Sequence, residues 1–204
     1  MSRVATLIMA AGESSRFGGC KQLTSVNGQS LLQQSIDQAH AFCPGQVFVV
    51  SGAWQQEISA ALENGNLKNA HFLYHPDWAQ GLGSSIAHGV TALSEVVDSL
   101  LIVLADQIAV TTEDFWGLYG QFTGENIVCG LYAGRRGVPA LFGRNRFEKL
   151  QTLQGDRGAK ALLYDQQIHV VDYLLEHARI DIDTPEDLHM WMTEKTSQRM
   201  IDVR

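Results

Sequence analysis

The chain has 204 residues, of which 45% are apolar and 18% are charged, and its mean hydropathy is −0.06. These values predict a globular protein with a sizeable core. The net charge of −7 argues against partners that are bound through their phosphates along an extended surface, such as nucleic acid or an anionic membrane.

Apolar runs alternate with helix signals along the first 120 residues. Val4–Met9 and Leu100–Ala105 are continuously apolar, which is typical of buried strands in a parallel sheet. Ser30 has the character of a helix cap, and so has Thr111 or Thr112. The predicted strands are Val4–Met9, Gln46–Val50, Ala70–Tyr74, Leu100–Ala105, Asn126–Tyr132, Pro139–Phe142 and His169–Val171. The predicted helices are Leu31–Phe42, Trp54–Leu62, Ser85–Val97, one from Thr111 or Thr112 to Phe122, Arg144–Leu150, Gly158–Tyr164 and a last helix that begins at Thr184-Pro185-Glu186.

This order of elements predicts an α/β fold, with a doubly wound, Rossmann-like, mostly parallel sheet and a mixed C-terminal part. The sequence has no repeat, low-complexity tract or linker-like stretch, so we expect one domain over residues 1–204. Three scattered cysteines predict a reduced, cytoplasmic setting, and the apolar run Val4–Ala11 is too short for a signal peptide or a membrane span. Ligands of such sheets bind beyond the carboxyl ends of the strands.

The loop after the first predicted strand combines small residues, hydroxyls and two cations. Glycines let backbone N–H groups approach phosphate oxygens closely, while Arg16 and Lys21 supply permanent charge. A Walker loop is excluded because Gln22 follows Lys21 and the glycine spacing is wrong, and the pattern G-x-G-x-x-G is absent. The alternative interpretation is a flexible surface loop that happens to hold two cations.

The charges are distributed unevenly along the chain. Residues 1–30 carry a net +2, residues 31–131 a net −9, residues 132–161 a net +5 and residues 162–204 a net −5. Basic charge is therefore concentrated in two short segments, and a phosphorylated small molecule is one ligand that such segments would suit.

Six segments carry distinctive strings in a fixed order. They are Ala10–Leu23 (AAGESSRFGGCKQL), His75–Ile86 (HPDWAQGLGSSI), Leu104–Gln107 (LADQ), Gly137–Phe142 (GVPALF), Gly155–Lys160 (GDRGAK) and Asp181–Leu188 (DIDTPEDL). Together they resemble the motifs of the MobA-like nucleotidyltransferases. They are similar in particular to the molybdenum cofactor cytidylyltransferase branch, which reads A-A-G at the first turn where the guanylyltransferases read A-G-G. The chain departs from that branch at His75, Leu82 and Ile108, where Asn, Met and Pro are usual.

The resemblance implies a fold of the nucleotide-diphospho-sugar transferase type. It also implies an Mg²⁺-dependent transfer of CMP from CTP to the terminal phosphate of molybdopterin, with release of pyrophosphate. A CTP-binding part would cover about residues 1–110, and an acceptor-binding part about residues 111–195. The partners would be a nucleotide, a pterin phosphate and a molybdoenzyme or its chaperone, with no nucleic acid and no membrane.

The resemblance assigns roles to residues of all six motifs. Lys21, Arg16 and Asp106 would be catalytic, and Asp106 and Asp183 would bind Mg²⁺, which two carboxylates usually hold together with water and phosphate oxygens. The nucleotide-binding residues would be Ala10, Ala11, Gly12, Ser14, Arg16, Lys21, Gly81, Gly83, Ser84 and Ser85. The acceptor-binding residues would be Gly137, Pro139, Asp156, Arg157 and Gly158.

Each assignment has a plainer alternative. Asp106 could be an aspartate of a turn, Asp183 could simply be an acidic residue at the start of a helix, and Ser84 could be an ordinary helix cap. At the level of function, the alternatives are a guanylyltransferase or sugar-phosphate nucleotidyltransferase of the same fold, and a catalytically silent cofactor-delivery protein. Ala11 argues against the guanylyltransferase. The retained Lys21, Asp106 and Asp183 argue against the silent protein.

Overall fold

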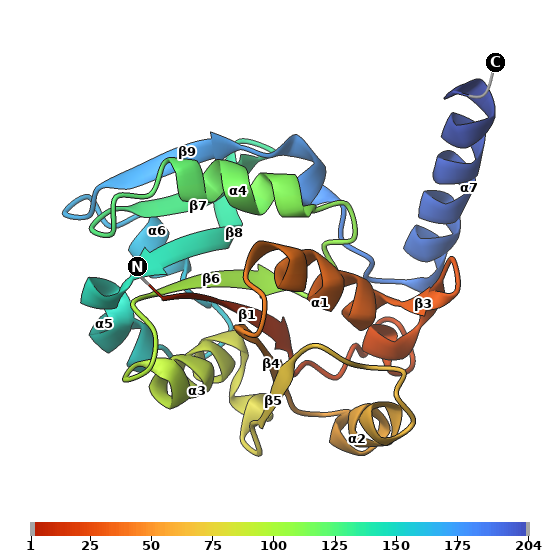
Figure 1. The fold of residues 1–204 in the computed structure, drawn as a ribbon, viewed down its shortest axis with the longest axis horizontal. Coiled ribbons are helices and arrows are strands. Elements are labelled where there is room, and N and C mark those ends of the chain that lie inside the picture. Colours follow the sequence, from red (N-terminus) through yellow and green to blue (C-terminus); the bar gives the residue numbers. More distant parts are fainter. Residues whose placement is uncertain (1–2, 203–204) are drawn as a thin grey trace.

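A seven-stranded sheet runs through the molecule in the order β5-β4-β1-β6-β8-β7-β9 (Figure 1). This computed structural model describes the backbone of residues 3–202 and the side chains of residues 3–193. Four pairs of neighbouring strands are parallel: β1 with β4, β1 with β6, β4 with β5, and β7 with β9. β8 is antiparallel to both of its neighbours, β6 and β7. The strands are β1 (Val4–Ala10), β4 (Val47–Ser51), β5 (His71–Tyr74), β6 (Ser99–Leu104), β7 (Ile127–Tyr132), β8 (Arg135–Gly143) and β9 (Val170–Leu174). The predicted α/β fold with a mixed C-terminal part is confirmed.

Helices cover both faces of this sheet. α1, α2 and α4 pack on one face and α3, α5 and α6 on the other, while α7 extends away from the body (Figure 1). Within residues 3–202, the helices lack a segment long and apolar enough to cross a membrane. The helices are α1 (Leu31–Phe42), α2 (Gln55–Glu63), α3 (Leu82–Leu93), α4 (Thr112–Gly120), α5 (Phe147–Gln151), α6 (Lys160–Leu163) and α7 (Pro185–Asp202).

Strand β1 shows why the central strands are continuously apolar. Its side chains alternate between the two faces, so that Leu7 packs with the cluster beneath α3 and Ile8 with the cluster beneath α1. Both side chains are fully buried, and each contributes roughly 1.5–3 kcal/mol through the loss of apolar contact with water. A strand anchored on both faces holds the loop that follows it in a fixed position.

The structure differs from the sequence prediction at some element ends. Helix α3 begins at Leu82 rather than Ser85, directly after Gly81, whose φ of 100° is strained for other residues. A small hairpin, β2 (Ser25–Val26) and β3 (Gln29–Ser30), was not predicted. Its turn residues, Asn27 and Gly28, have φ of 54° and 85°, and Asn-Gly is the usual signal for such a turn.

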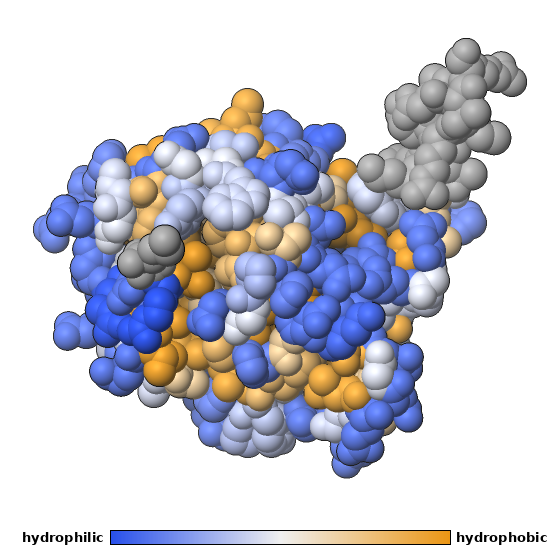
Figure 2. Space-filling model, viewed as in Figure 1, coloured by the Kyte–Doolittle hydropathy of each residue, from blue (hydrophilic) through white to orange (hydrophobic). Residues whose placement is uncertain are grey.

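Aromatic side chains fasten α4 to the C-terminal end of α1. Phe42 meets Phe115, Trp116 and Tyr119 edge to face, with the ring centroids of Phe42 and Trp116 4.7 Å apart. Trp116 is 51% exposed, and Figure 2 shows pale and orange surface over the middle of α4. These contacts fix the outer layer on the side of the sheet that carries α1.

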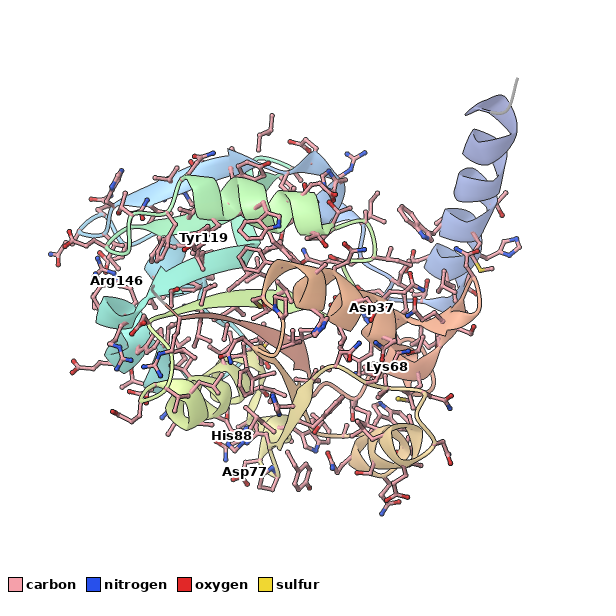
Figure 3. The ribbon with its side chains drawn as sticks, in the orientation of Figure 1. Asp37, Lys68, Asp77, His88, Tyr119 and Arg146 are labelled. Atoms are coloured by element: carbon pink, nitrogen blue, oxygen red, sulfur yellow. The ribbon has the colours of Figure 1, made fainter. Side chains whose placement is uncertain are left out.

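The side chain of Gln33 joins α1 to the segment that leads into β5. It is 2% exposed, and its Nε2 donates to Oδ1 of Asp37 (2.7 Å) and to the carbonyl oxygen of Lys68 (3.3 Å). Its Oε1 accepts from the amide of Lys68 (2.8 Å). Figure 3 shows Asp37 on α1 and Lys68 on the neighbouring segment. One buried amide therefore pairs both backbone groups of Lys68.

We predict that Gln33→Leu lowers the free energy of unfolding by about 1–3 kcal/mol, because both backbone groups of Lys68 lose their partner. In a protein of this size, Tm should fall by about 2–4 °C per kcal/mol, which circular dichroism can measure. Lys68→Ala is the matched control, because it keeps the backbone groups and removes only an exposed side chain. Equal melting temperatures for wild type and Gln33→Leu would contradict the assignment.

Candidate nucleotide site

The loops that follow β1, β4 and β6 meet at one edge of the sheet, because these strands are adjacent and parallel. A cavity of about 350 Å³ lies between the loops after β1 and β6 and the segment that follows β5, and this volume is within the range of small-molecule sites. Its lining is formed by Met9, Ala10, Ala11, Gly12, Glu13, Ser14, Lys21, Gln22, Leu31, Trp78, Ala79, Gly81, Leu82, Ser85, Leu104, Ala105, Asp106 and Asp156.

Gln22 holds the loop after β1 through its carbonyl groups. Its Nε2 donates to the carbonyl oxygens of Ala10 and Gly12, both at 3.1 Å, and the side chain is 5% exposed. The carbonyl oxygen between them, that of Ala11, accepts from the amide of Ala53 (3.0 Å). Three successive carbonyls are therefore occupied by protein donors. Gln22 had no predicted role, because its only signal in the sequence is its place after Lys21 in the first motif.

The amide groups of the same loop are left for a ligand. Within the described part of the chain, the amides of Gly12, Glu13 and Ser14 donate to no protein acceptor, although all three residues line the cavity. Trp54 steadies this stretch by donating from Nε1 to the carbonyl oxygen of Glu13 (2.9 Å). Adjacent amide donors beside a cation form an anion site, and phosphate is the usual anion in such a site.

Lys21 lies between two carboxylates that are far apart in sequence. Its Nζ is 2.7 Å from Oδ2 of Asp106 and 3.3 Å from Oδ1 of Asp183, and its side chain is only 11% exposed. Arg16 pairs with the other oxygen of Asp183 at 2.9 Å, but its side chain is 73% exposed. The structure thus brings together the four charged residues of the predicted catalytic and metal set.

The two carboxylates fit a divalent cation. Oδ1 of Asp106 is buried and has no hydrogen-bond partner among the described residues, so this oxygen is free to coordinate a cation. Three or more side chains of His, Cys, Asp or Glu do not gather as a complete metal site anywhere in the described part of the chain. A cation bound by Asp106 and Asp183 would therefore take its remaining ligands from phosphate oxygens and water, as Mg²⁺ usually does.

Asp181 adds a third negative group to this cluster. Its pKa is raised to about 6, first by burial and then by the charges of Asp106 and Asp183, while Lys21 acts in the opposite direction. The cluster thus contains more negative charge than Lys21 alone balances.

The predicted nucleotide-binding residues around the start of α3 lie in two different environments. Gly81 and Ser85 line the cavity, whereas Gly83 packs against the backbone of Gln154. The Ser84 hydroxyl is 2.8 Å from Nε2 of His75. His75 is thus tied to the first turn of α3.

The residues predicted to bind the acceptor also separate. Asp156 lines the cavity together with the loop after β1. The other four are absent from the described lining: Gly137 faces Tyr132, Pro139 lies within β8, Gly158 packs on Leu82, and Arg157 is exposed. The basic residues of 132–161 are likewise absent from the described lining of this cavity, and their expected contact with a phosphate stays a prediction.

Gln107 links the site to the C-terminal half of the sheet. Its Nε2 donates to the carbonyl oxygens of Val138 and Ala178, both at 2.9 Å, and lies 3.4 Å from the hydroxyl of Tyr132. Because Gln107 follows Asp106 directly, these bonds fix the backbone next to the Asp106 carboxylate. The LADQ motif contained this residue, but only the fold reveals its partners.

Comparison with known proteins agrees with this geometry. Residues 6–171 match the MobA-like NTP transferase domain. The chain belongs to this family. It is a nucleotidyltransferase of the MobA-like type, and the recognition made from its six motifs is confirmed.

Two characterised relatives align over nearly the whole chain. The chain is 28% identical over 190 residues to the molybdenum cofactor cytidylyltransferase of Escherichia coli K12, covering 92% of this chain and 94% of that protein. It is 26% identical over 197 residues to the nicotine blue oxidoreductase of Paenarthrobacter nicotinovorans, covering 91% and 95%.

Solved structures share the fold. A homologue of Mycobacterium tuberculosis Rv0371c, from Mycobacterium sp. strain JC1, superposes with a TM-score of 0.82 at 25% identity, covering 96% of this chain and 98% of that one. Rv0371c of M. tuberculosis itself, in complex with manganese, gives a TM-score of 0.78 at 20% identity, covering 94% and 99%. The fold is that of the nucleotide-diphospho-sugar transferases, as expected.

The environment of His75 predicts a pH dependence of stability. Burial, then the nearby His88, lower the pKa of His75 from 6.5, against a smaller opposing effect of Asp77. Figure 3 shows His88 and Asp77 in the same region, and the rings of His75 and His88 are stacked 4.6 Å apart. A lowered pKa in the folded state means that the stabilisation is complete above pH 6.5 and is lost as the pH falls through the folded pKa.

We therefore expect His75→Asn, which does not titrate, to lose less stability than wild type between pH 7.5 and pH 5. Thermal unfolding across this range measures the Tm of the variant minus the Tm of wild type, and this difference should increase as the pH falls. His169→Asn, at an exposed position, is the control and should follow wild type. Parallel pH profiles for wild type and His75→Asn would show that His75 is not the group responsible.

Proposed function

We propose that the chain is a cytidylyltransferase that moves CMP from CTP to the terminal phosphate of molybdopterin and releases pyrophosphate, with Mg²⁺ as cofactor. The observation that carries the proposal is the position of the Lys21 ammonium group between Asp106 and Asp183, beside the unpaired amides of the loop after β1. This arrangement offers a triphosphate both donors and a cation-binding pair.

The reaction needs little general acid or general base catalysis from the protein. An oxygen of the acceptor phosphate forms a bond to the α-phosphorus of CTP, and the bond from that phosphorus to the oxygen bridging to the β-phosphate breaks, so that pyrophosphate leaves with the electron pair. The second pKa of a phosphate monoester is near 6, so the nucleophile is already anionic at neutral pH. Catalysis then depends on positioning and charge neutralisation.

The residues of the site supply both requirements. Lys21 and the amides of the loop would hold the β- and γ-phosphates and stabilise the charge that develops on pyrophosphate. A charge-assisted hydrogen bond contributes about 1.5–3 kcal/mol, which is about one to two decades in rate when the bond is made mainly in the transition state. Arg16, being exposed, is suited to reach a phosphate at the mouth of the cavity.

Asp106 and Asp183 would hold the Mg²⁺. Nucleotidyltransferases of this family commonly use a divalent metal. When bound, the cation neutralises phosphate charge and draws electron density from the phosphorus. The free Oδ1 of Asp106 and the surplus of carboxylates over Lys21 support a cation at this position.

The choice of substrates rests on sequence as well as geometry. Ala10-Ala11-Gly12 favours CTP over GTP by resemblance to the cytidylyltransferase branch, and the E. coli relative carries the activity proposed here over the same length of chain. The relative named as an oxidoreductase is nearly as similar, so overall likeness alone does not decide the substrate. The product would be passed to a molybdoenzyme or its chaperone.

The direct test is pyrophosphate release from labelled CTP, GTP or ATP in the presence of Mg²⁺ and molybdopterin that carries molybdenum. We expect turnover with CTP and much less with the purine nucleotides. Release with GTP but not CTP would replace the proposal by a guanylyltransferase. No release with any of the three, from folded protein that still binds nucleotide, would favour a delivery protein without catalysis.

Asp106→Asn should lower the rate of pyrophosphate release by at least about 100-fold, the loss expected when a preorganised charge is removed from a reaction centre. Asp98→Asn is the matched control, because Asp98 precedes the same strand at its opposite end and pairs with Arg3 and Arg144 on the surface. Steady-state rates at saturating nucleotide and melting temperatures should be measured for both variants. Equal losses in the two variants would mean that Asp106 acts only through stability.

A further inference from the structure

Asp156 belongs to a wall of the cavity that differs from the phosphate-binding wall. One group of lining residues, from Gly12 to Lys21 together with Asp106, supplies amides and the ammonium group. The other group, Trp78, Ala79, Gly81, Leu82, Ser85 and Asp156, contains no cation among the described lining residues. A triphosphate held by the first group leaves the ribose and base to face the second group. This deduction rests on the proposed binding of a nucleoside triphosphate.

The loop that carries Asp156 is held tightly against the start of α3. The amide of Gly83 donates to the carbonyl oxygen of Gly155 (2.7 Å). A Cβ atom at Gly83 would lie 2.7 Å from the carbonyl oxygen of Gln154, and one at Gly81 would overlap Oδ1 of Asp156. Neither glycine can therefore be replaced without moving this loop. The close packing fixes the backbone next to Asp156, so that this exposed residue is presented at the cavity wall.

The Asp156 carboxylate has no protein partner. Among the described residues, no Lys, Arg or His forms an ion pair with it, and no hydrogen bond reaches it. A carboxylate at this wall would repel phosphate, so it is suited to a neutral ligand group that donates hydrogen bonds. Trp78 and Leu82 beside it offer apolar surface to a ring.

We infer that Asp156 reads the base of the nucleotide by accepting a hydrogen bond from the exocyclic amino group of cytosine. Aspartate accepts from N4 of cytosine in other recognition sites, whereas uracil presents the acceptor O4 at the same position. An ionised carboxylate has no donor to offer O4. Asp156 therefore selects CTP against UTP, and its place in the GDRGAK motif belongs to nucleotide recognition rather than to the acceptor.

The test is the binding of CTP and of UTP, with Mg²⁺ and without acceptor, to wild type and to Asp156→Asn. The amide of the variant can turn its NH₂ group toward O4 of uracil, so the ratio of the two dissociation constants should fall about tenfold relative to wild type. Asp77→Asn is the matched control: Asp77 lies in the loop before Trp78 (Figure 3) and is absent from the described lining of the cavity, so the ratio for this variant should equal that of wild type.

Three results would overturn the inference. An unchanged ratio in Asp156→Asn would show that the carboxylate does not face the base. Equal weakening of CTP and UTP would place it on the ribose. Unchanged binding of both nucleotides with a raised KM for molybdopterin would return it to the acceptor. The proposed function fails separately, if wild type releases no pyrophosphate from CTP with acceptor, because the binding ratio is measured without turnover.

Discussion

The ammonium group of Lys21 is shielded from water and lies between Asp106 and Asp183. A buried cation without a partner costs several kcal/mol, and two carboxylates at close range repel each other unless a cation separates them. The ammonium group therefore depends on the two carboxylates, and it reduces the repulsion between them, while Arg16 adds a second cation at Asp183. Their surplus negative charge, increased by Asp181, is the condition under which a divalent cation and an anionic substrate can enter together.

The fold places these groups by joining three distant parts of the chain. Lys21 follows β1 and Asp106 follows β6, and the two strands are neighbours in the sheet. Asp183 is positioned from the C-terminal side, where the amide of Ile182 donates to the carbonyl oxygen of Asp106 (3.3 Å) and Gln107 binds the backbone of Ala178. The N-terminal and C-terminal parts of the chain thus share one site, and a change in either part would move its charges.

The features of the site that depend on neighbouring residues in the sequence could be predicted from it. The apolar run before Asp106 placed that carboxylate at the end of a buried strand, and the small residues around Gly12 indicated an anion loop. That Asp106 and Asp183 lie close together was predicted only from family resemblance, because 77 residues separate them and the spacing of residues along the chain does not predict such a contact. The part played by Gln22 was missed, because a side chain that binds backbone carbonyls leaves no periodic signal. Asp156 was expected at the acceptor by family resemblance, and its packing against α3, which places it in the cavity lining, could not be seen from the sequence.

Charge counted along the sequence does not show which cations are already paired in the folded protein. Much of the basic segment 132–161 is committed to ion pairs with surface acids, namely Arg136 with Asp172, Arg144 with Asp98 and Lys149 with Asp165. Exposed pairs of this kind contribute only about 0–1 kcal/mol and are screened by salt. At the cavity, by contrast, the donors are the oriented amides of the loop after β1 and the ammonium group of Lys21, which is held in place by Asp106 and Asp183. An acidic protein can bind a polyphosphate in this way, since a few fixed donors at short range outweigh a larger number of distant charges.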